Sequence, residues 1–337
     1  GIACCVSSMR IGKEMQFFGA RANLAKCLLY AINGGVDVKN REQVGPAYKP
    51  VTSEYLDYDE VVDKFDAMMD WLADLYVNTL NLIQYMHDKY YYEAAEMALI
   101  DTDVKRTFAT GIAGFSHVVD SLSAIKYAKV KTVRDETGIV VDYEIEGDFP
   151  KYGNDDDYAD SVMQDVFNLY HDLITGRPTM RGGKYGVDML PTTCHVYFGE
   201  VIGATANGRK ANIPVSEGIS PEKSADVNGP TAVIKSCAKM DHLATAGTLL
   251  NQKFTPDVVA GEKGLENMAS LIRSYFAMDG HHVQFNVIDR QTLIEAQKHP
   301  DDYRDLIVRV AGYSDFFRNL SKPLQDEIIN RTEQSFE

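Results

Sequence analysis

Two thiols and one glycine are the residues of this chain whose types and surroundings indicate chemistry. Cys4 and Cys5 are adjacent in Ala3-Cys4-Cys5-Val6-Ser7, and Gly312 lies in Arg309-Val310-Ala311-Gly312-Tyr313-Ser314. A carbon-centred backbone radical must flatten its α-carbon, and glycine alone can do so without a side chain that clashes. The neighbouring amide nitrogen and carbonyl then spread the spin, and a thiol can exchange a hydrogen atom with such a radical. The two ends of the sequence therefore predict one site.

The composition excludes several classes of partner. The chain has 337 residues, of which 45% are hydrophobic and 25% charged, as in an ordinary globular protein with a sizeable core. A net charge of −15 argues against nucleic acid and anionic membranes, and no apolar run approaches the roughly 20 residues that span a bilayer. The five cysteines are sparse and include no Cys-x-x-Cys pair, so we expect a cytoplasmic protein without disulfides or bound metal.

The periodicity of the sequence predicts the elements that position these residues. Apolar residues recur at alternating four- and three-residue steps from Val61 to Leu82, which indicates a long amphipathic helix. We also expect helices over residues 18–32, 107–128 and 320–336, a helix that opens at 154–157, and strands over 138–145 and 284–288. The first of these helices would carry Arg21 and end at Asn33-Gly34-Gly35. Mixed helices and short strands favour an α/β architecture.

The chain resembles the glycyl radical enzyme family over essentially its whole length. Residues 3–153 resemble the second half of pyruvate formate-lyase, for example in MQFFGARANLAK at 15–26 and SLSAIKYA at 121–128. From about residue 181 onward, GATANGRK at 203–210 and NGPTA at 228–232 are more similar to the dehydratase and C–N lyase branch. The motif around Gly312 is shared by all branches.

The resemblance implies a fold. Family members are longer chains, folded as a ten-stranded α/β barrel of two half-barrels, in whose centre the cysteine loop and the radical loop meet. This sequence would form the second half-barrel with a C-terminal glycyl radical subdomain. We expect the half-barrel with the cysteine loop over residues 1–180, a loop-rich barrel segment over 181–255 and the glycyl radical domain over 256–337.

The N-terminal match implies the acyl transfer of a formate C-acetyltransferase, in which pyruvate and coenzyme A give acetyl-CoA and formate in glucose fermentation. Cys5 would pass its hydrogen atom to the Gly312 radical, and the sulfur of Cys4 would carry the acetyl group. Arg21 would clamp the pyruvate carboxylate, a bidentate task that lysine performs poorly. Phe18 would pack against the substrate methyl group.

The dehydratase branch offers the first alternative, with a diol, hydroxyproline or choline-like substrate. Those enzymes carry a glutamate two residues after a single catalytic cysteine, as a base for the substrate hydroxyl. This sequence has Ser7 there and a doubled cysteine, which favours acyl transfer. The second alternative is a non-catalytic half that needs a partner chain to supply the other half-barrel, because unpaired strand edges invite association.

The resemblance also implies partners. A separate radical S-adenosylmethionine enzyme would install the radical on Gly312, and that radical would be the protein's own cofactor, with no other cofactor or metal bound. The active protein would be an oxygen-sensitive homodimer.

Overall fold

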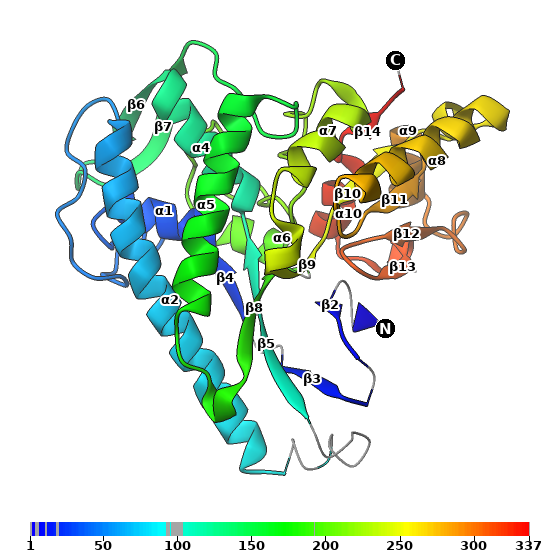
Figure 1. The fold of residues 1–337 in the computed structure, drawn as a ribbon. Helices are drawn as coiled ribbons and strands as arrows, with labels where there is room; N and C mark the ends of the chain where they lie inside the picture. The colour runs from blue at the N-terminus through cyan, green and yellow to red at the C-terminus, as the bar shows by residue number, and fades with distance from the viewer. Residues whose placement is uncertain are drawn as a thin grey trace.

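The computed structural model describes residues 2–3, 7–10, 12–17, 20–91, 95, 104–191 and 193–336. Its largest sheet has five parallel strands in the order β3–β5–β8–β9, with β4 also paired to β5 (Figure 1). β3 pairs with the start of β5 and β4 with its end, so these two short strands follow one another along one edge. The strands are β3 (Glu14–Phe17), β4 (Arg21–Asn23), β5 (Lys105–Ala113), β8 (Lys184–Met189) and β9 (Thr245–Thr248).

Helices cover one face of this sheet. In Figure 1, α5 and α2 stand to the left of β5 and β8, α5 packs on β8, and α1 and α4 pack against α2 and α5. Phe17, Phe108 and Tyr185 contact one another across β3, β5 and β8, and the Tyr185 hydroxyl donates to Asn81 Oδ1 of α2 at 3.2 Å. These aromatic side chains therefore point to the covered face. The four helices are α1 (Leu24–Ile32), α2 (Tyr58–Asp88), α4 (Phe115–Tyr127) and α5 (Asp157–Thr175).

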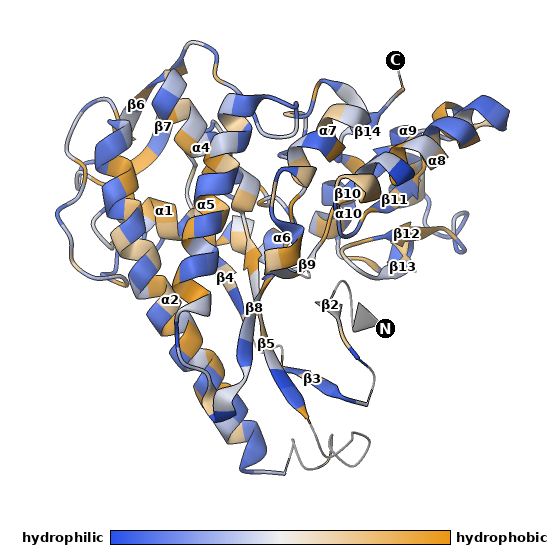
Figure 2. Ribbon diagram, viewed as in Figure 1, coloured by the Kyte–Doolittle hydropathy of each residue, from blue (hydrophilic) through white to orange (hydrophobic). Residues whose placement is uncertain are grey.

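Helix α2 confirms the predicted amphipathic helix. For its second half, however, the prediction of which residues form the buried face is wrong. Val61, Phe65 and Met68 are buried, whereas Leu75 and Leu82 are 49% and 60% exposed. A seven-residue repeat drifts by about 20° per heptad around a straight helix, so the buried stripe moves to other positions. Figure 2 shows the apolar side of α2 turned toward the other elements. The buried residues of the second half include Ala73, Tyr76, Val77 and Leu80.

Two of the predicted helices begin as strands. Residues 21–23 form β4, and α1 starts only after the N-cap Asn23, whose side chain accepts from Lys26 N at 3.1 Å. Residues 105–113 form β5 before α4 starts at Phe115. The second half of β5 is buried on both faces, and such a strand lacks the alternation that distinguishes it from a buried helix. The predicted end of α1 is confirmed, with positive φ at Gly34 and Gly35.

Other local predictions are close to the structure. The strand predicted over 138–145 is β7 (Val140–Glu146), which pairs antiparallel with β6 (Lys129–Arg134). The helix predicted to open at 154–157 is α5, with Asp156 as its N-cap. The strand predicted over 284–288 is β11 (Gln284–Val287).

A second parallel sheet and a hairpin form the C-terminal part of the molecule. β10 (Asn251–Phe254) lies between β11 and β14 (Glu333–Gln334), and β12 (Ile307–Arg309) pairs antiparallel with β13 (Ser314–Phe316). Helices α8 (Gly261–Ala277), α9 (Arg290–Lys298) and α10 (Lys322–Ile329) accompany them (Figure 1). A separate apolar cluster holds the hairpin to α9 and α10, and it includes Leu293, Val308, Val310, Phe317 and Ile328.

The predicted C-terminal helix is shorter than expected. It ends at Ile329 and is followed by β14, and Ser321 occupies the N-cap position without a capping hydrogen bond from its side chain. The described residues also form the helices α6 (Cys194–Glu200), α7 (Gly229–Ala238), η1 (Met180–Gly182), η2 (His242–Ala244), η3 (Pro256–Val259) and η4 (Phe317–Asn319).

Candidate active site

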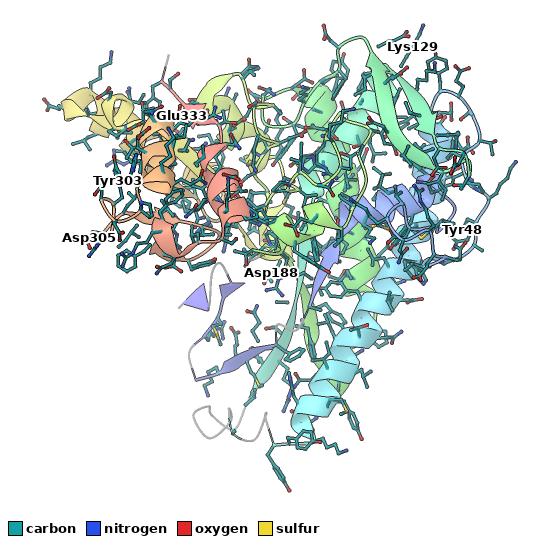
Figure 3. All side chains as sticks on the ribbon, turned by 180° about the vertical axis from the view of Figure 1, so that it is seen from behind. Tyr48, Lys129, Asp188, Tyr303, Asp305 and Glu333 are labelled. Carbon is teal, nitrogen blue, oxygen red and sulfur yellow. The ribbon has the colours of Figure 1, made fainter. Side chains whose placement is uncertain are left out.

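The segment that carries the two thiols is flanked by a short hairpin. β1 (Ile2–Ala3) and β2 (Ser7–Ser8) pair antiparallel, and β2 contacts β9 of the large sheet. Figures 1 and 3 both show β2 beside the β12–β13 hairpin. Cys4 and Cys5 lie outside the residues that the structure describes, as does Phe18, so the predicted roles of all three stay predictions.

Gly312 lies at the tip of the β12–β13 hairpin. The strands pair as far as Arg309 and Ser314, and Val310 N donates to Tyr313 O at 2.8 Å. Gly312 has a φ of +84° while Ala311 before it has negative φ, the pattern of a type II turn, which requires positive φ at its second central residue. Glycine therefore has a conformational reason to stand here in addition to the chemical one.

Side chains from distant segments hold the backbone of this hairpin. Asn286 on β11 makes two hydrogen bonds to Arg309, because Arg309 N donates to Asn286 Oδ1 and Asn286 Nδ2 donates to Arg309 O, both at 2.8 Å. Arg331 Nη2 donates to Val310 O at 2.8 Å. Gly312 N itself donates to Gln284 Oε1 at 3.3 Å. The position of the turn is thus set by groups that bind its peptide units.

A buried ion cluster holds Arg331 in place. The Arg331 guanidinium contacts the Glu327 carboxylate at 2.9 and 3.2 Å, and Lys223 and His195 approach the same carboxylate at 3.3 and 3.6 Å. Burial alone would raise the pKa of Glu327, but the charges of Arg331 and Lys223 hold that pKa well below its usual range. Burial lowers the pKa of His195, so its imidazole is neutral at pH 7. Glu327 therefore stays ionised and fixes the arginine that holds the turn of Gly312.

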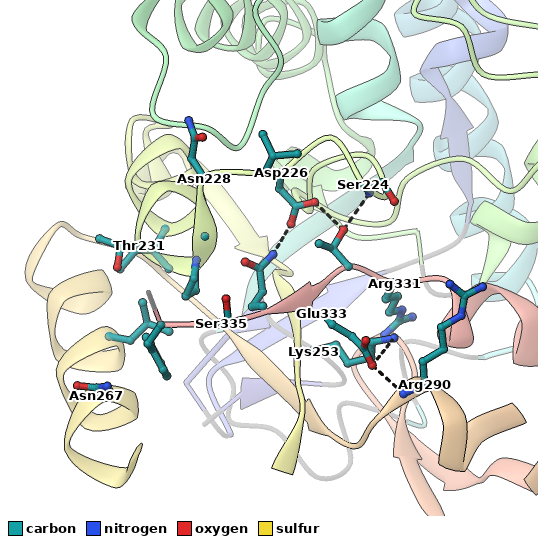
Figure 4. A pocket seen from close by; sticks show the side chains of 18 of the residues that line it. Ser224, Asp226, Asn228, Thr231, Lys253, Asn267, Arg290, Arg331, Glu333 and Ser335 are labelled. Carbon is teal, nitrogen blue, oxygen red and sulfur yellow. Dashed lines mark hydrogen bonds and ion pairs between the residues drawn. The ribbon is translucent and has the colours of Figure 1, made fainter. Parts of the chain in front are cut away.

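A cavity of about 1040 Å³ opens behind Arg331, between α7, α8 and β14 (Figure 4). Lys253 is buried in its wall, donates to Ile329 O at 3.0 Å and lies 3.7 Å from Glu333, and burial lowers its pKa to about 8. Arg290 N also donates to Glu333 at 2.7 Å. Lys253 and Arg331 in this wall therefore contact carboxylate or carbonyl oxygens of the chain, and the Arg290 guanidinium donates to Asn330 Oδ1 at 2.9 Å.

Arg21 lies on strand β4, not on a helix as predicted. Strand register places Arg21 beside Gly111 of β5, and Gly111 beside Asp188 of β8. Since side chains alternate along a strand, this row points away from the helix-covered face to which Phe108 points. A Cβ on Gly111 would lie 2.6 Å from Arg21 Nε, so the missing side chain lets the arginine lie across β5 toward Asp188. Figure 3 shows Asp188 where the large sheet meets the C-terminal part.

Several residues of this site were missed from the sequence. Gln284 and Asn286 alternate within the predicted strand over 284–288 and are each only 6% exposed, so two polar residues on one face of a short strand were the available signal. Asn251, Arg331 and Asp188 stand in no recognisable motif. Among the described residues, no group of three or more His, Cys, Asp or Glu is arranged to hold a metal ion. In the same part of the chain, no helix is long and apolar enough to cross a membrane.

The fold and the hairpin around Gly312 define a class of protein, and comparison with known families agrees. The family of pyruvate formate lyase-like proteins matches residues 1–199, and the glycine radical family matches residues 215–318. The chain belongs to the glycyl radical enzymes, and its large sheet is part of the α/β barrel of that family.

Its relatives include several dehydratases. The chain is 47% identical, over 362 aligned residues, to trans-4-hydroxy-L-proline dehydratase of Clostridioides difficile, with 100% of this chain and 46% of that protein covered. The crystal structure of the enzyme of that name with trans-4-hydroxy-L-proline bound matches with a TM-score of 0.88 at 44% identity, again over 100% of this chain and 46% of the other.

Two further structures are similar. The glycerol-bound B12-independent glycerol dehydratase of Clostridium butyricum matches with a TM-score of 0.85 at 34% identity and covers 100% of this chain and 46% of its own. A structure for 1,2-propanediol dehydration in Roseburia inulinivorans matches with a TM-score of 0.86 at 33% identity, over 99% and 46%. The chain spans about half the length of the relatives it matches.

These relatives overturn the predicted acyl transfer. The prediction of a formate C-acetyltransferase, with pyruvate and coenzyme A as substrates and a role in glucose fermentation, rested on the doubled cysteine, on Ser7 and on matches within residues 3–153. The 47% identity over the full chain is to a dehydratase, so the assignment as an acyltransferase is wrong. A few residues around one loop were given more weight than the scaffold of residues 203–232, which had indicated the dehydratase branch.

Proposed function

We propose that this chain supplies the thiol loop and the radical domain of a glycyl radical dehydratase that acts on trans-4-hydroxy-L-proline or a close analogue. The observation that carries the proposal is the 47% identity to trans-4-hydroxy-L-proline dehydratase over all of the chain. The identity to the structures with glycerol or 1,2-propanediol chemistry is lower, at 34% and 33%.

The row of Arg21, Gly111 and Asp188 supports an amino acid as the substrate rather than a diol. A guanidinium binds a carboxylate with two parallel hydrogen bonds, and an aspartate pairs with an amine cation. Arg21 and Asp188 point to the same face, from strands on either side of Gly111. A zwitterionic amino acid carries both complementary charges, whereas glycerol and 1,2-propanediol carry neither.

The proposed reaction assigns roles to the other predicted residues. Gly312 holds the resting radical, and a thiol of the pair Cys4 and Cys5 takes up the radical and removes a hydrogen atom from the substrate carbon beside the hydroxyl-bearing carbon. The substrate radical then loses water, and the thiol returns the hydrogen atom. The hydroxyl group leaves as water once it gains a proton, and the ring nitrogen of the substrate gives a proton up. Since Ser7 has no carboxylate, we expect another segment to carry this proton. Phe18 lines the apolar side of the substrate.

The proposal includes a partner and an assembly state. A radical S-adenosylmethionine enzyme would install the radical on Gly312, because the α-hydrogen must leave as an atom, with one electron, and acid–base side chains remove only a proton. The active enzyme would be a homodimer.

The test is anaerobic turnover. The enzyme that contains this chain is activated with a radical S-adenosylmethionine activase, and trans-4-hydroxy-L-proline, glycerol and 1,2-propanediol are supplied separately. Mass spectrometry should find a product lighter by one water from the amino acid alone. Turnover of a diol with no change in the amino acid would overturn the proposal, and the Gly312→Ala variant controls for background reactions.

A further inference from the structure

The N–H of Gly312 is the end of a continuous chain of hydrogen bonds that begins at a buried carboxylate. Gly312 N donates to Gln284 Oε1 at 3.3 Å, Gln284 Nε2 donates to Asn251 Oδ1, and Asn251 Nδ2 donates to Glu217 Oε1. Gln284 and Asn251 are register partners on β11 and β10, so their side chains leave the same face of the small sheet. Glu217 is 4% exposed and Gln284 6%. We call Glu217, Asn251 and Gln284 the amide relay.

The relay has a direction that the carboxylate sets. Glu217 Oε1 accepts hydrogen bonds both in the ionised carboxylate and in a carboxyl group that carries its proton on Oε2, whereas a side-chain amide donates at one end and accepts at the other. Asn251 must therefore turn its NH₂ toward Glu217 and its oxygen toward Gln284. Gln284 must in turn offer its NH₂ to Asn251, which leaves its own oxygen for the Gly312 N–H. Without the carboxylate, the side-chain amide of Gln284 could flip. Its NH₂ group would then lie next to the Gly312 N–H, and two donors would face each other.

Neighbouring groups support the same direction. Arg309 Nε donates to Gln284 Oε1 at 2.7 Å, and Asn251 Nδ2 also lies 3.4 Å from Val310 O. The Ser220 hydroxyl donates to Glu217 Oε1 at 2.8 Å and accepts Asn251 N at 3.0 Å. The contacts of Arg309 and Val310 would be lost or repulsive if an amide of the relay were reversed, and the contacts of Ser220 hold Glu217 and the Asn251 backbone beside one another.

Burying the carboxyl group of Glu217 costs free energy, which argues for a functional role of this residue. Its second oxygen, Oε2, has no hydrogen-bond partner in the described part of the chain, and the residue lines a small cavity of about 40 Å³. Burial raises the pKa of Glu217 to about 7, although Arg331 and the amide of Asn251 both favour the ionised form. A carboxyl group that served packing alone would be replaced by an apolar side chain at lower cost.

We infer that Glu217 is a positioning residue, which acts through Asn251 and Gln284 to keep an acceptor oxygen on the N–H of the radical-bearing glycine. An acceptor on this N–H makes the nitrogen a better electron donor to the half-filled orbital on the neighbouring α-carbon. The relay thus stabilises the resting radical and fixes the turn that presents it. The inference rests on the proposed function, in that Gly312 carries the radical.

The first experiment needs no radical. Amide hydrogen–deuterium exchange is measured by mass spectrometry on the peptide that spans residues 307–316, in the unactivated enzyme. Glu217→Leu removes the carboxylate and Gln284→Met removes the acceptor itself, and both should speed exchange of this peptide by about tenfold, the effect of losing one buried hydrogen bond. Glu217→Gln keeps an acceptor toward Asn251 and should stay near the wild type.

A matched control lies in the wall of the same small cavity. Asp226 is a second buried carboxylate there, but its partners are Thr332 and Gln334 rather than the relay. Asp226→Leu should lower stability and leave exchange over residues 307–316 unchanged. The inference would be overturned if Asp226→Leu sped exchange of this peptide as much as Glu217→Leu. Loss of any buried carboxylate near the cavity would then have the same effect, and the relay would have no specific role.

The second experiment reads the radical. After activation, the electron paramagnetic resonance doublet of Glu217→Leu and Gln284→Met should show an altered hyperfine splitting and an about tenfold lower radical yield per folded chain, while Glu217→Gln and Asp226→Leu keep the wild-type spectrum. A wild-type spectrum in Gln284→Met would overturn the inference. This measurement remains decisive even if the Glu217 variants do not fold. No doublet in the activated wild type would instead contradict the proposed function, and the exchange result would still decide on the relay.

Discussion

The hairpin that carries Gly312 and the sheet row that carries Arg21 are positioned by different means. Side chains from β10, β11 and the end of α10 reach the hairpin and bind its peptide groups. The row owes its geometry to the pairing of β4, β5 and β8, and a glycine in the middle strand leaves space for the arginine. In the hairpin, side chains from other segments bind the backbone. In the row, the pairing of the strands determines where the side chains of Arg21 and Asp188 point.

The difference follows from the chemistry that each region is proposed to perform. A glycyl radical resides on the backbone of a residue that has no side chain, so contacts to its own and neighbouring peptide groups fix its position directly. A substrate-binding arginine works through its side chain, so a parallel sheet in the correct register is sufficient. We therefore expect the hairpin to be sensitive to buried polar residues far away in sequence, and the row to be sensitive to the size of residues on neighbouring strands.

The largest expected effect is that of Gly312→Ala. The variant should lose the electron paramagnetic resonance doublet and all turnover, because a side chain at residue 312 prevents the α-carbon from flattening. It should also lose about 1–2 kcal/mol of stability from the left-handed backbone conformation. Gly138 offers a matched control, since it has the same φ of +84° in the turn between β6 and β7 and a Cβ there would meet nothing within 4 Å. A retained doublet in Gly312→Ala would place the radical elsewhere.

Arg331→Met tests the side-chain hold on the hairpin. The substitution leaves the buried carboxylate of Glu327 with Lys223 and His195 alone, and breaking one partner of a buried ion pair costs about 3–5 kcal/mol. Urea denaturation should show this loss in the free energy of unfolding. Arg177→Met is the control, because Arg177 pairs with two exposed aspartates and should cost at most about 1 kcal/mol. Equal losses in the two variants would contradict the special role of the buried cluster.

Part of the row of Arg21, Gly111 and Asp188 could be predicted from the sequence. The side chains that bind the peptide groups of the hairpin could hardly be predicted. Arg21 was identified from its motif, but its strand was mistaken for the start of a helix because Ala20, Leu24 and Ala25 are good helix formers. Its neighbour Asp188 depends on which strands pair, and strand order in a parallel sheet is set by crossovers that a single sequence does not specify.

The hold on the hairpin is less visible in the sequence for a physical reason. Glu217, Asn251, Gln284 and Arg331 are spread over more than a hundred positions and meet only after two sheets have formed. Each is an ordinary polar residue whose importance lies in its burial. Gly312 itself was identified from its motif as the radical residue, but the left-handed conformation that it adopts in the turn was not predicted.

The buried carboxylate of Glu217 should make stability depend on pH. Its pKa is raised from 4.5 to about 7 in the folded state, chiefly by burial and despite the facing Arg331, while Glu327 adds repulsion. A raised carboxyl pKa gives stability that is complete below about pH 4.5 and lost as the pH rises to about 7. Relative to Glu217→Gln, the wild type should therefore lose on the order of 3 kcal/mol between these values. Urea denaturation of both proteins across this pH range measures the difference between their free energies of unfolding. A difference that stayed constant with pH would contradict the raised pKa of Glu217.

The smallest expected effect concerns the row and sharpens the contrast with the hairpin. In Gly111→Ala, the new methyl group would overlap Arg21 Cδ and lie 2.6 Å from Arg21 Nε, so the guanidinium must leave its path across β5. We expect KM for trans-4-hydroxy-L-proline to rise about tenfold, equivalent to about 1.4 kcal/mol of lost binding, with the radical yield unchanged. Arg21→Lys should raise KM similarly, because an ammonium cannot bind a carboxylate in the bidentate mode. A fall in radical yield with KM unchanged, in either variant, would show that the row serves the hairpin rather than the substrate.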